Sequence, residues 1–158
     1  MTQGSGLGPG LEKCKIRSMT MKTPGFILMS AVALAAATLF AQGLTTNDGV
    51  GTAEQAKRGS DVYGMQCAAC HDAQLAGSGT APALAGTDFS ANWKDETVGA
   101  LFERIRATMP ADNPGSLKRD QVADLVSFIL NFNKYPTSQK ELGTEFEALK
   151  AIKITAVK

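Results

Sequence analysis

The stretch Cys67-Ala68-Ala69-Cys70-His71 decides how the rest of this chain is interpreted. It holds two of the three cysteines and the only histidine among 158 residues. Two cysteines separated by two residues and followed at once by histidine form the C-x-x-C-H pattern of covalent haem attachment. In that chemistry the two thiols add to the vinyl groups of one haem, and the adjacent imidazole binds the iron. We therefore expect one covalent haem c, held by Cys67, Cys70 and His71.

Two other interpretations of the cysteine pair are weaker. A thioredoxin-like redox pair lies near a β-α-β pattern, and no such pattern is visible in this sequence. A structural zinc site takes four ligands from cysteine, histidine or carboxylate side chains. Cys14 is the only other cysteine, and there is no second histidine. A haem is therefore the better explanation of the motif.

Four segments outside the motif resemble the class I c-type cytochromes. Gly59 and Tyr63 precede the motif, as a glycine and an aromatic residue do on the first helix of that family. The other matches are the loop Ala81-Pro82-Ala83-Leu84-Ala85-Gly86, with Ala in place of the family's first Gly, the segment Thr108-Met109-Pro110, and a closing helix with Leu125 and Phe128. The resemblance covers roughly residues 52 to 133. It implies an all-α cytochrome c fold, with helices packed around one haem.

The sixth iron ligand has two candidates after residue 41, Met65 and Met109. Met65 lies two residues before Cys67, on the attachment side of the haem, and would have to cross to the other face. Met109 lies in a Met-Pro loop at the end of an expected helix, far enough along the chain to reach that face. We therefore expect His71 and Met109 to bind the metal, a pairing that raises the reduction potential.

The resemblance assigns further residues to the cofactor. It implies that the carbonyl of Pro82 accepts a hydrogen bond from the second ring nitrogen of His71, since metal-bound histidines usually have such a partner. It also implies that the ring nitrogen of Trp93 donates to a haem propionate, with simple packing of Trp93 as the alternative. Leu84 is expected in the haem wall. The expected cofactor-binding residues are Cys67, Cys70, His71, Pro82, Leu84, Trp93 and Met109.

The first 41 residues have the pattern of a targeting segment. No charged residue falls between Gly25 and Ala41, and Lys22 lies just before this apolar run. A positive start, an apolar run and small residues at its end are typical of a secretory signal peptide. We expect cleavage near Ala41, which leaves residues 42–158 as the monohaem domain with a C-terminal tail. A retained membrane anchor is the alternative, at the lower limit of spanning length.

Composition agrees with an exported electron carrier. Residues 42–158 hold no cysteine beyond the motif pair, so no disulfide framework is expected. They carry 12 Lys or Arg and 14 Asp or Glu, a net charge of −2, which argues against a nucleic-acid-binding protein. The resemblance implies haem attachment outside the cytoplasm, and therefore a periplasmic location. Met19 and Met21 remain alternative start sites.

The helices follow from apolar spacing and capping residues. We expect a first helix over residues 52–65, with a break at Gly59 as the alternative, and a loop over 72–92. Asp95 is expected to cap a helix with an apolar stripe at Val98, Leu101, Phe102 and Ile105. Ser116 is expected to cap the last main helix. Residues 145–151 are expected to form a short helix with Phe146 and Leu149 facing the body, before an extended end.

The function expected from these features is one-electron transfer by a protein that is not itself an enzyme. Its donor would be a dehydrogenase, with quinoprotein dehydrogenases as one candidate, or a bc-type complex, and its acceptor an oxidase or another cytochrome. The alternative is a haem subunit of a redox enzyme, or a haem sensor, either of which needs an exchangeable sixth position. Residues 72–86 carry only Asp72 as a charge, and residues 107–116 only Asp112. We therefore expect a largely uncharged docking patch.

Overall fold

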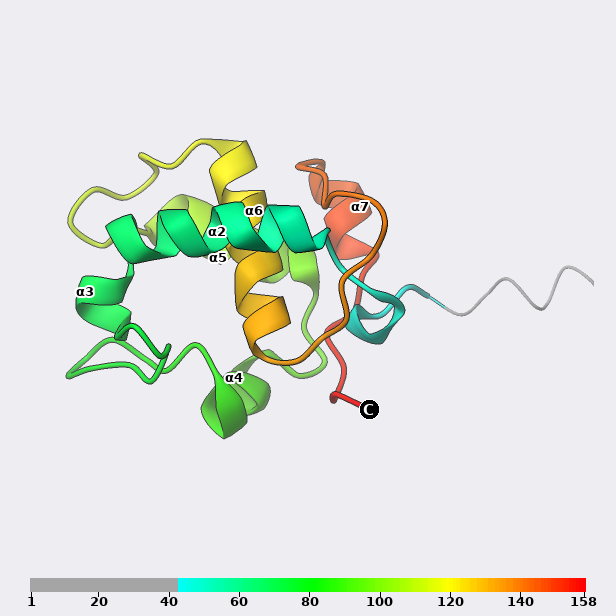
Figure 1. The fold of residues 1–158 in the computed structure, drawn as a ribbon, viewed down its shortest axis with the longest axis horizontal. Helices are drawn as coiled ribbons and strands as arrows, with labels where there is room; N and C mark the ends of the chain where they lie inside the picture. The colour runs from blue at the N-terminus through cyan, green and yellow to red at the C-terminus, as the bar shows by residue number, and fades with distance from the viewer. Residues whose placement is uncertain (1–42) are drawn as a thin grey trace, which may run out of the picture. The chain divides into compact units, whose positions relative to one another are not determined.

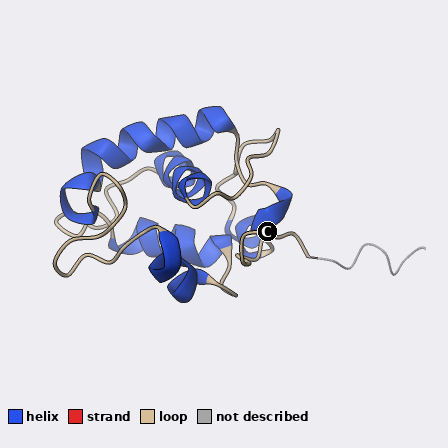
Figure 2. Ribbon diagram, turned by 60° about the horizontal axis from the view of Figure 1, so that its bottom comes forward, coloured by secondary structure: helices blue, strands red, loops and turns tan. Residues whose placement is uncertain are grey.

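The computed structural model describes residues 43–158, which fold into helices joined by loops (Figure 1). The elements are η2 (Thr46–Asp48), α2 (Ala53–Gln66), α3 (Ala68–His71), α4 (Gly86–Trp93), α5 (Val98–Thr108), α6 (Arg119–Phe132) and α7 (Phe146–Lys150). Figure 2 draws no strand in this part of the chain, where only isolated bridges occur. The all-α fold is thus confirmed. Among these helices none has both the length and the apolar character to cross a membrane.

Helices α2 and α6 cross at very short distance (Figure 1). A Cβ atom placed on Gly59 would lie 2.0 Å from the carbonyl oxygen of Asp124, so only glycine fits at this crossing. One turn further along α2, the ring of Tyr63 packs on Phe128 of α6 with the ring centroids 5.3 Å apart. The helix runs unbroken through Gly59, and the hydroxyl of Thr52 caps its start by accepting from the N–H of Gln55 at 3.0 Å.

The core lies between α5, α6 and the short α4. The expected stripe of α5 is buried, with Phe102 fully covered and Ile105 9% exposed. On α6 the buried face includes Val122, Leu125, Val126 and Ile129. Phe89 of α4 is fully buried in the same core cluster, although nearly all of α4 lies inside the expected loop 72–92. That expectation was wrong because glycine and proline interrupt the segment, and a helix of two turns with one core residue leaves little periodic signal.

Three further expectations about helix ends are corrected. Helix α5 is capped by Thr97, whose hydroxyl accepts from the N–H of Ala100 at 3.1 Å, whereas Asp95 has φ 73 and lies outside the helix. The N-cap of α6 is Lys118 rather than Ser116, since the side chain of Gln121 turns back to accept from the Lys118 N–H at 3.0 Å. In α7, Leu149 is buried as expected, but Phe146 is 39% exposed.

The tail, residues 133–158, closes the domain by main-chain hydrogen bonds. Its extended end lies between two other segments, because Lys153 forms a parallel bridge with Thr45 and an antiparallel bridge with Thr97. Ile154 is fully buried there, which confirms the expected extended segment. Nearer the start of the tail, the carbonyl of Pro136 accepts from the N–H of Val50 at 3.0 Å. The tail therefore fastens the start of the described chain to the body.

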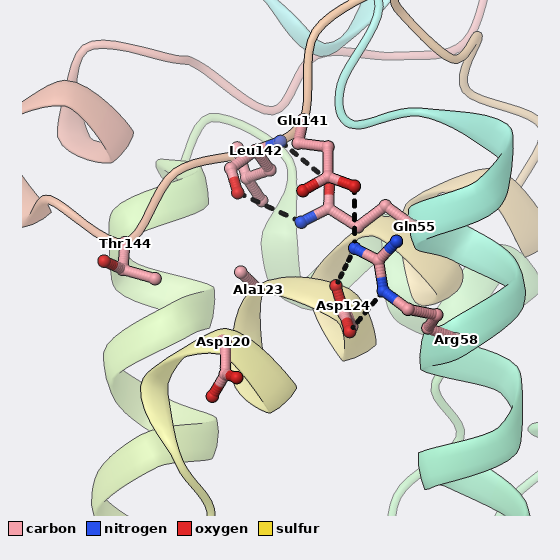
Figure 3. A pocket seen from close by; sticks show the side chains of 8 residues that line it. All are labelled: Gln55, Arg58, Asp120, Ala123, Asp124, Glu141, Leu142 and Thr144. Atoms are coloured by element: carbon pink, nitrogen blue, oxygen red, sulfur yellow. Dashed lines mark hydrogen bonds and ion pairs between the residues drawn. The ribbon is translucent and has the colours of Figure 1, made fainter.

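The middle of the tail is bound to α2 and α6 through side chains (Figure 3). The amide of Gln55 makes both possible hydrogen bonds to the main chain of Leu142, donating at 3.0 Å and accepting at 2.7 Å. Arg58 forms a two-pronged pair with Asp124, at 3.1 and 3.0 Å, and also reaches Glu141 at 2.9 Å. These groups line a cavity of about 320 Å³. Arg58 pairs with both carboxylates, and no expected haem-binding residue lines the cavity.

Candidate haem-binding site

The C-x-x-C-H motif forms one helical turn of its own. Cys67 ends α2 with φ −127, and α3 begins at the next residue. The N–H groups of Cys70 and His71 both donate to the carbonyl of Cys67, at 3.1 and 2.9 Å. Both thiols are unbonded, with Cys67 half-buried and Cys70 exposed. The two cysteines, which form no disulfide, therefore lie within one helical turn that ends at the histidine.

The described surroundings of Cys67 hold no further set of metal ligands. Burial, and secondarily the neighbouring Cys70, raise the pKa of the Cys67 thiol to about 11. In addition, residues 43–158 contain no group of three His, Cys, Asp or Glu side chains that could hold a metal ion. The zinc and thioredoxin-like alternatives find no support in this geometry.

His71 has the arrangement of a metal ligand. Its side chain is buried, and its Nδ1 lies 2.8 Å from the carbonyl oxygen of Pro82. A carbonyl can only accept, so Nδ1 carries the hydrogen and Nε2 keeps a free lone pair. This hydrogen bond also fixes the orientation of the ring. The expected contact between His71 and Pro82 is therefore present, and Nε2 is the nitrogen that fits an iron.

The loop after α3 folds back to bring Pro82 to the imidazole. The carbonyl of His71 accepts from the N–H of Gly77 at 2.9 Å, and the N–H of Leu84 donates to the carbonyl of Leu75 at 2.8 Å. Gly77 has φ 75, and a Cβ atom there would lie 2.7 Å from the carbonyl oxygen of Ala81. Glycine is needed here for both reasons. Leu75, fully buried, anchors the loop to the core.

Of the two candidate methionines, only Met109 is packed against the body. It directly follows α5, where its N–H donates to the carbonyl of Ile105 at 3.0 Å, and its side chain is partly buried against the core. Met65 is 72% exposed. A ligand on the second haem face needs a thioether held by the protein, which favours Met109.

The remaining expected residues lie around the same loops. Leu84 is half-buried, and its carbonyl accepts from the side-chain amide of Asn133 at 2.9 Å. Trp93 is the last residue of α4, and the centroids of its ring and of the Phe89 ring lie 6.4 Å apart. Pro82 is exposed except for its contact with His71. These positions are compatible with a cofactor wall, and the roles of Leu84 and Trp93 stay predictions.

Two supporting residues were missed from the sequence. Asn133 joins two parts of the loop, because its amide also accepts from the N–H of Gly86 at 2.9 Å. The hydroxyl of Tyr63 donates to the carbonyl of Asp72 at 2.6 Å, directly after the histidine. Neither contact has a local sequence signal. Asn133 is far along the chain from the loop that it binds, and an aromatic residue such as Tyr63 is normally assigned to packing.

The donor set fits a covalently bound haem. It comprises two free thiols in C-x-x-C spacing, a buried imidazole with Nε2 available, and a packed thioether. Thiolate ligands or a carboxylate cluster would indicate another metal, but an imidazole and a thioether are the axial pair of cytochromes c.

Comparisons with known proteins agree with this fit. Residues 54–129, just under half of the chain, match the family model described as cytochrome c oxidase, cbb3-type, subunit III. The matched segment contains the motif, the loop and Met109. The match supports a c-type cytochrome domain, which implies an electron-transfer haem protein with covalently bound haem c.

One solved structure is similar in its chain trace, the crystal structure of the sulfane dehydrogenase SoxCD from Paracoccus pantotrophus. The two chains share 16% identity, the similarity covers 88% of this chain and 68% of that chain, and the TM-score is 0.46. No curated protein sequence matches this chain.

Proposed function

We propose that this protein is a periplasmic monohaem electron carrier in which Cys67 and Cys70 hold the haem and His71 and Met109 bind its iron. The observation that carries the proposal is the buried His71, directly after the cysteine pair, with Nδ1 bound to the Pro82 carbonyl so that Nε2 keeps its lone pair. When bound, the haem supplies an iron that gains and loses one electron.

The residues of this chain hold that iron in one coordination state. Pro82 keeps the proton of His71 on Nδ1, so Nε2 stays available through each cycle. The partly buried thioether of Met109 is a soft ligand and favours the reduced iron, which raises the potential. His71 and Met109 would occupy both sides of the iron and leave no position for a substrate. The bound haem would then supply one-electron transfer between a donor and an acceptor.

The partners are redox proteins, and their classes are part of the proposal. We propose a dehydrogenase, with quinoprotein dehydrogenases as one candidate, or a bc-type complex as donor. An oxidase or a further cytochrome would be the acceptor. The description of the matched family refers to an oxidase subunit, which supports an oxidase as one end of the route.

Carbon monoxide tests the carrier against the enzyme and sensor alternatives. The reduced holoprotein is mixed with carbon monoxide, and its absorption spectrum is followed by stopped flow. A carrier with both axial positions occupied should show no rapid spectral change. Rapid binding would mean an open or exchangeable sixth position, and would contradict the carrier.

The periplasmic address depends on residues 1–41, which lie outside the described residues. The proposal is that a signal peptide is cleaved near Ala41. Mass spectrometry of the exported protein should give a mass that starts near Gln42. A mass that includes residues 25–41 would instead mean a retained membrane anchor.

A further inference from the structure

The two tyrosines of this chain make similar hydrogen bonds in different places, and Tyr135 also pairs with the side chain of Thr46. Tyr63 and Tyr135 are each 3% exposed, and each hydroxyl donates to a main-chain carbonyl at 2.6 Å. The acceptor of Tyr135 is Thr155, in the tail. The acceptor of Tyr63 is Asp72, the residue directly after His71. Comparing the two therefore separates the effect of a buried tyrosine hydroxyl on protein stability from its effect on the position of His71.

The turn after His71 has an unusual main-chain conformation. Asp72 has φ 67, a left-handed value that residues with side chains rarely adopt. Its carboxylate accepts from the N–H of Gln74 at 2.7 Å, and its carbonyl accepts from the N–H of Leu75 at 3.1 Å. Both of those donors belong to the turn itself. The hydroxyl of Tyr63 is the contact that joins the Asp72 carbonyl to α2.

The hydroxyl of Tyr63 is held in place by the helix crossing. Its ring packs on Phe128 of α6 with the centroids 5.3 Å apart, one turn beyond the close approach at Gly59. A tyrosine ring has few rotatable bonds, so packing of the ring also fixes its oxygen. The hydrogen bond from Tyr63 therefore holds the Asp72 carbonyl in a fixed position relative to helices α2 and α6.

We infer that Tyr63 is a positioning residue for His71. The hydrogen bond that Nδ1 donates to the Pro82 carbonyl constrains one ring nitrogen, and the backbone from which the ring projects needs a separate constraint. Tyr63 supplies it by fixing the carbonyl of Asp72, in the second peptide group after His71, and thereby limits how far the backbone that carries the imidazole can move. The inference rests on the proposed function, in which His71 binds the haem iron.

The test compares the variants Tyr63→Phe and Tyr135→Phe as purified holoproteins. Each loses one buried hydroxyl donor, so both should unfold at lower temperature than the wild type. Two further readouts are measured: the principal g values of the ferric form by electron paramagnetic resonance, and the reduction potential by voltammetry. The wild type is measured first, because a protein without a low-spin haem signal would defeat the proposed function and not this inference.

We expect Tyr63→Phe to shift the g values and to change the ratio of reduced to oxidised protein at fixed potential by about threefold or more. A threefold change corresponds to a shift of about 28 mV in the reduction potential, because a tenfold change corresponds to 59 mV for a one-electron couple. Tyr135→Phe should leave both readouts at their wild-type values. Equal shifts in the two variants, or a Tyr63→Phe protein that loses stability with unchanged g values and potential, would overturn the inference.

A second variant keeps the test decisive if Tyr63→Phe yields no holoprotein. Tyr63 is the only tyrosine left in a Tyr135→Phe background, so 3-fluorotyrosine supplied during expression labels that position alone. Fluorination keeps the ring and makes the hydroxyl a stronger donor. The labelled protein should differ in g values and potential from the unlabelled Tyr135→Phe protein. Identical values would overturn the inference.

Discussion

The two ends of this molecule are held together in different ways. At the tail, the described residues satisfy one another: Gln55 pairs with the main chain of Leu142, and Ile154 is fully buried. At the ligand end, which we define as α3 with residues 72–86 and 108–116, the principal residues are incompletely covered. Cys70 and Pro82 are exposed, and Leu84 and Met109 are only partly buried. Protein packing therefore completes the tail, and the ligand end is where we propose that the haem binds.

The largest expected effect is at the helix crossing, on which both ends depend. Gly59→Ala would place a methyl group 2.0 Å from the Asp124 carbonyl oxygen, and neither backbone can move away cheaply. We expect a loss of about 3 kcal/mol in the free energy of unfolding, measured by denaturant titration. Gly64→Ala is the matched control on α2, since its Cβ would meet nothing within 4 Å. It should stabilise by up to about 1 kcal/mol, and an equal loss in both variants would contradict the close crossing.

The next largest expected effect is on the reduction potential, and it arises from a substitution at the ligand end. Met109→Ala should abolish the near-infrared sulfur-to-iron band of the ferric protein. It should also lower the potential by on the order of 0.1 V, a fraction of the roughly 0.8 V that axial ligands span. Met65→Ala, at a position that is 72% exposed, should change neither. If the Met65 variant loses the band instead, the ligand assignment is wrong.

A substitution that contacts the tail should instead lower stability and leave the reduction potential unchanged. Gln55→Ala leaves the N–H and carbonyl of Leu142 without their partners, and should cost about 2 kcal/mol of stability. The potential should remain that of the wild type, because the change is remote from the iron ligands. Gln66→Ala, exposed on the same helix, should stay within about 0.5 kcal/mol. A shifted potential in the Gln55 variant would mean that the two ends are coupled.

The smallest expected effect concerns the surface of the ligand end. Residues 111–116 are exposed, and Asp112 is their only charge. Arg119, one of the cations near this loop in sequence, lies over the ring of Phe102 at 5.2 Å and donates to the carbonyl of Thr144 in the tail. We expect the electron-transfer rate with the native partner to change by less than about tenfold between low and physiological salt. A steeper fall would show electrostatic steering.

Much of this arrangement could be predicted from the sequence, and the failures have physical causes. The first helix and the buried stripe of α5 agree with the sequence, because apolar spacing is a local signal. Helix α4 was missed because one buried residue, Phe89, holds it in a glycine-rich segment. The caps at Asp95 and Ser116 were wrong because long-range pairing and the side chain of Gln121 decide where those helices begin. The support of His71 by Tyr63 depends on tertiary structure alone.

The central claim is that Cys67 and Cys70 bond covalently to one haem. Mass spectrometry of the exported protein after denaturation and proteolysis measures it directly, on the peptide that contains residues 67–71. The account predicts that this peptide carries the mass of one haem through both cysteines, and that its haem stain survives denaturing electrophoresis. A peptide with both thiols free to react with an alkylating reagent, and haem lost on denaturation, would contradict the account.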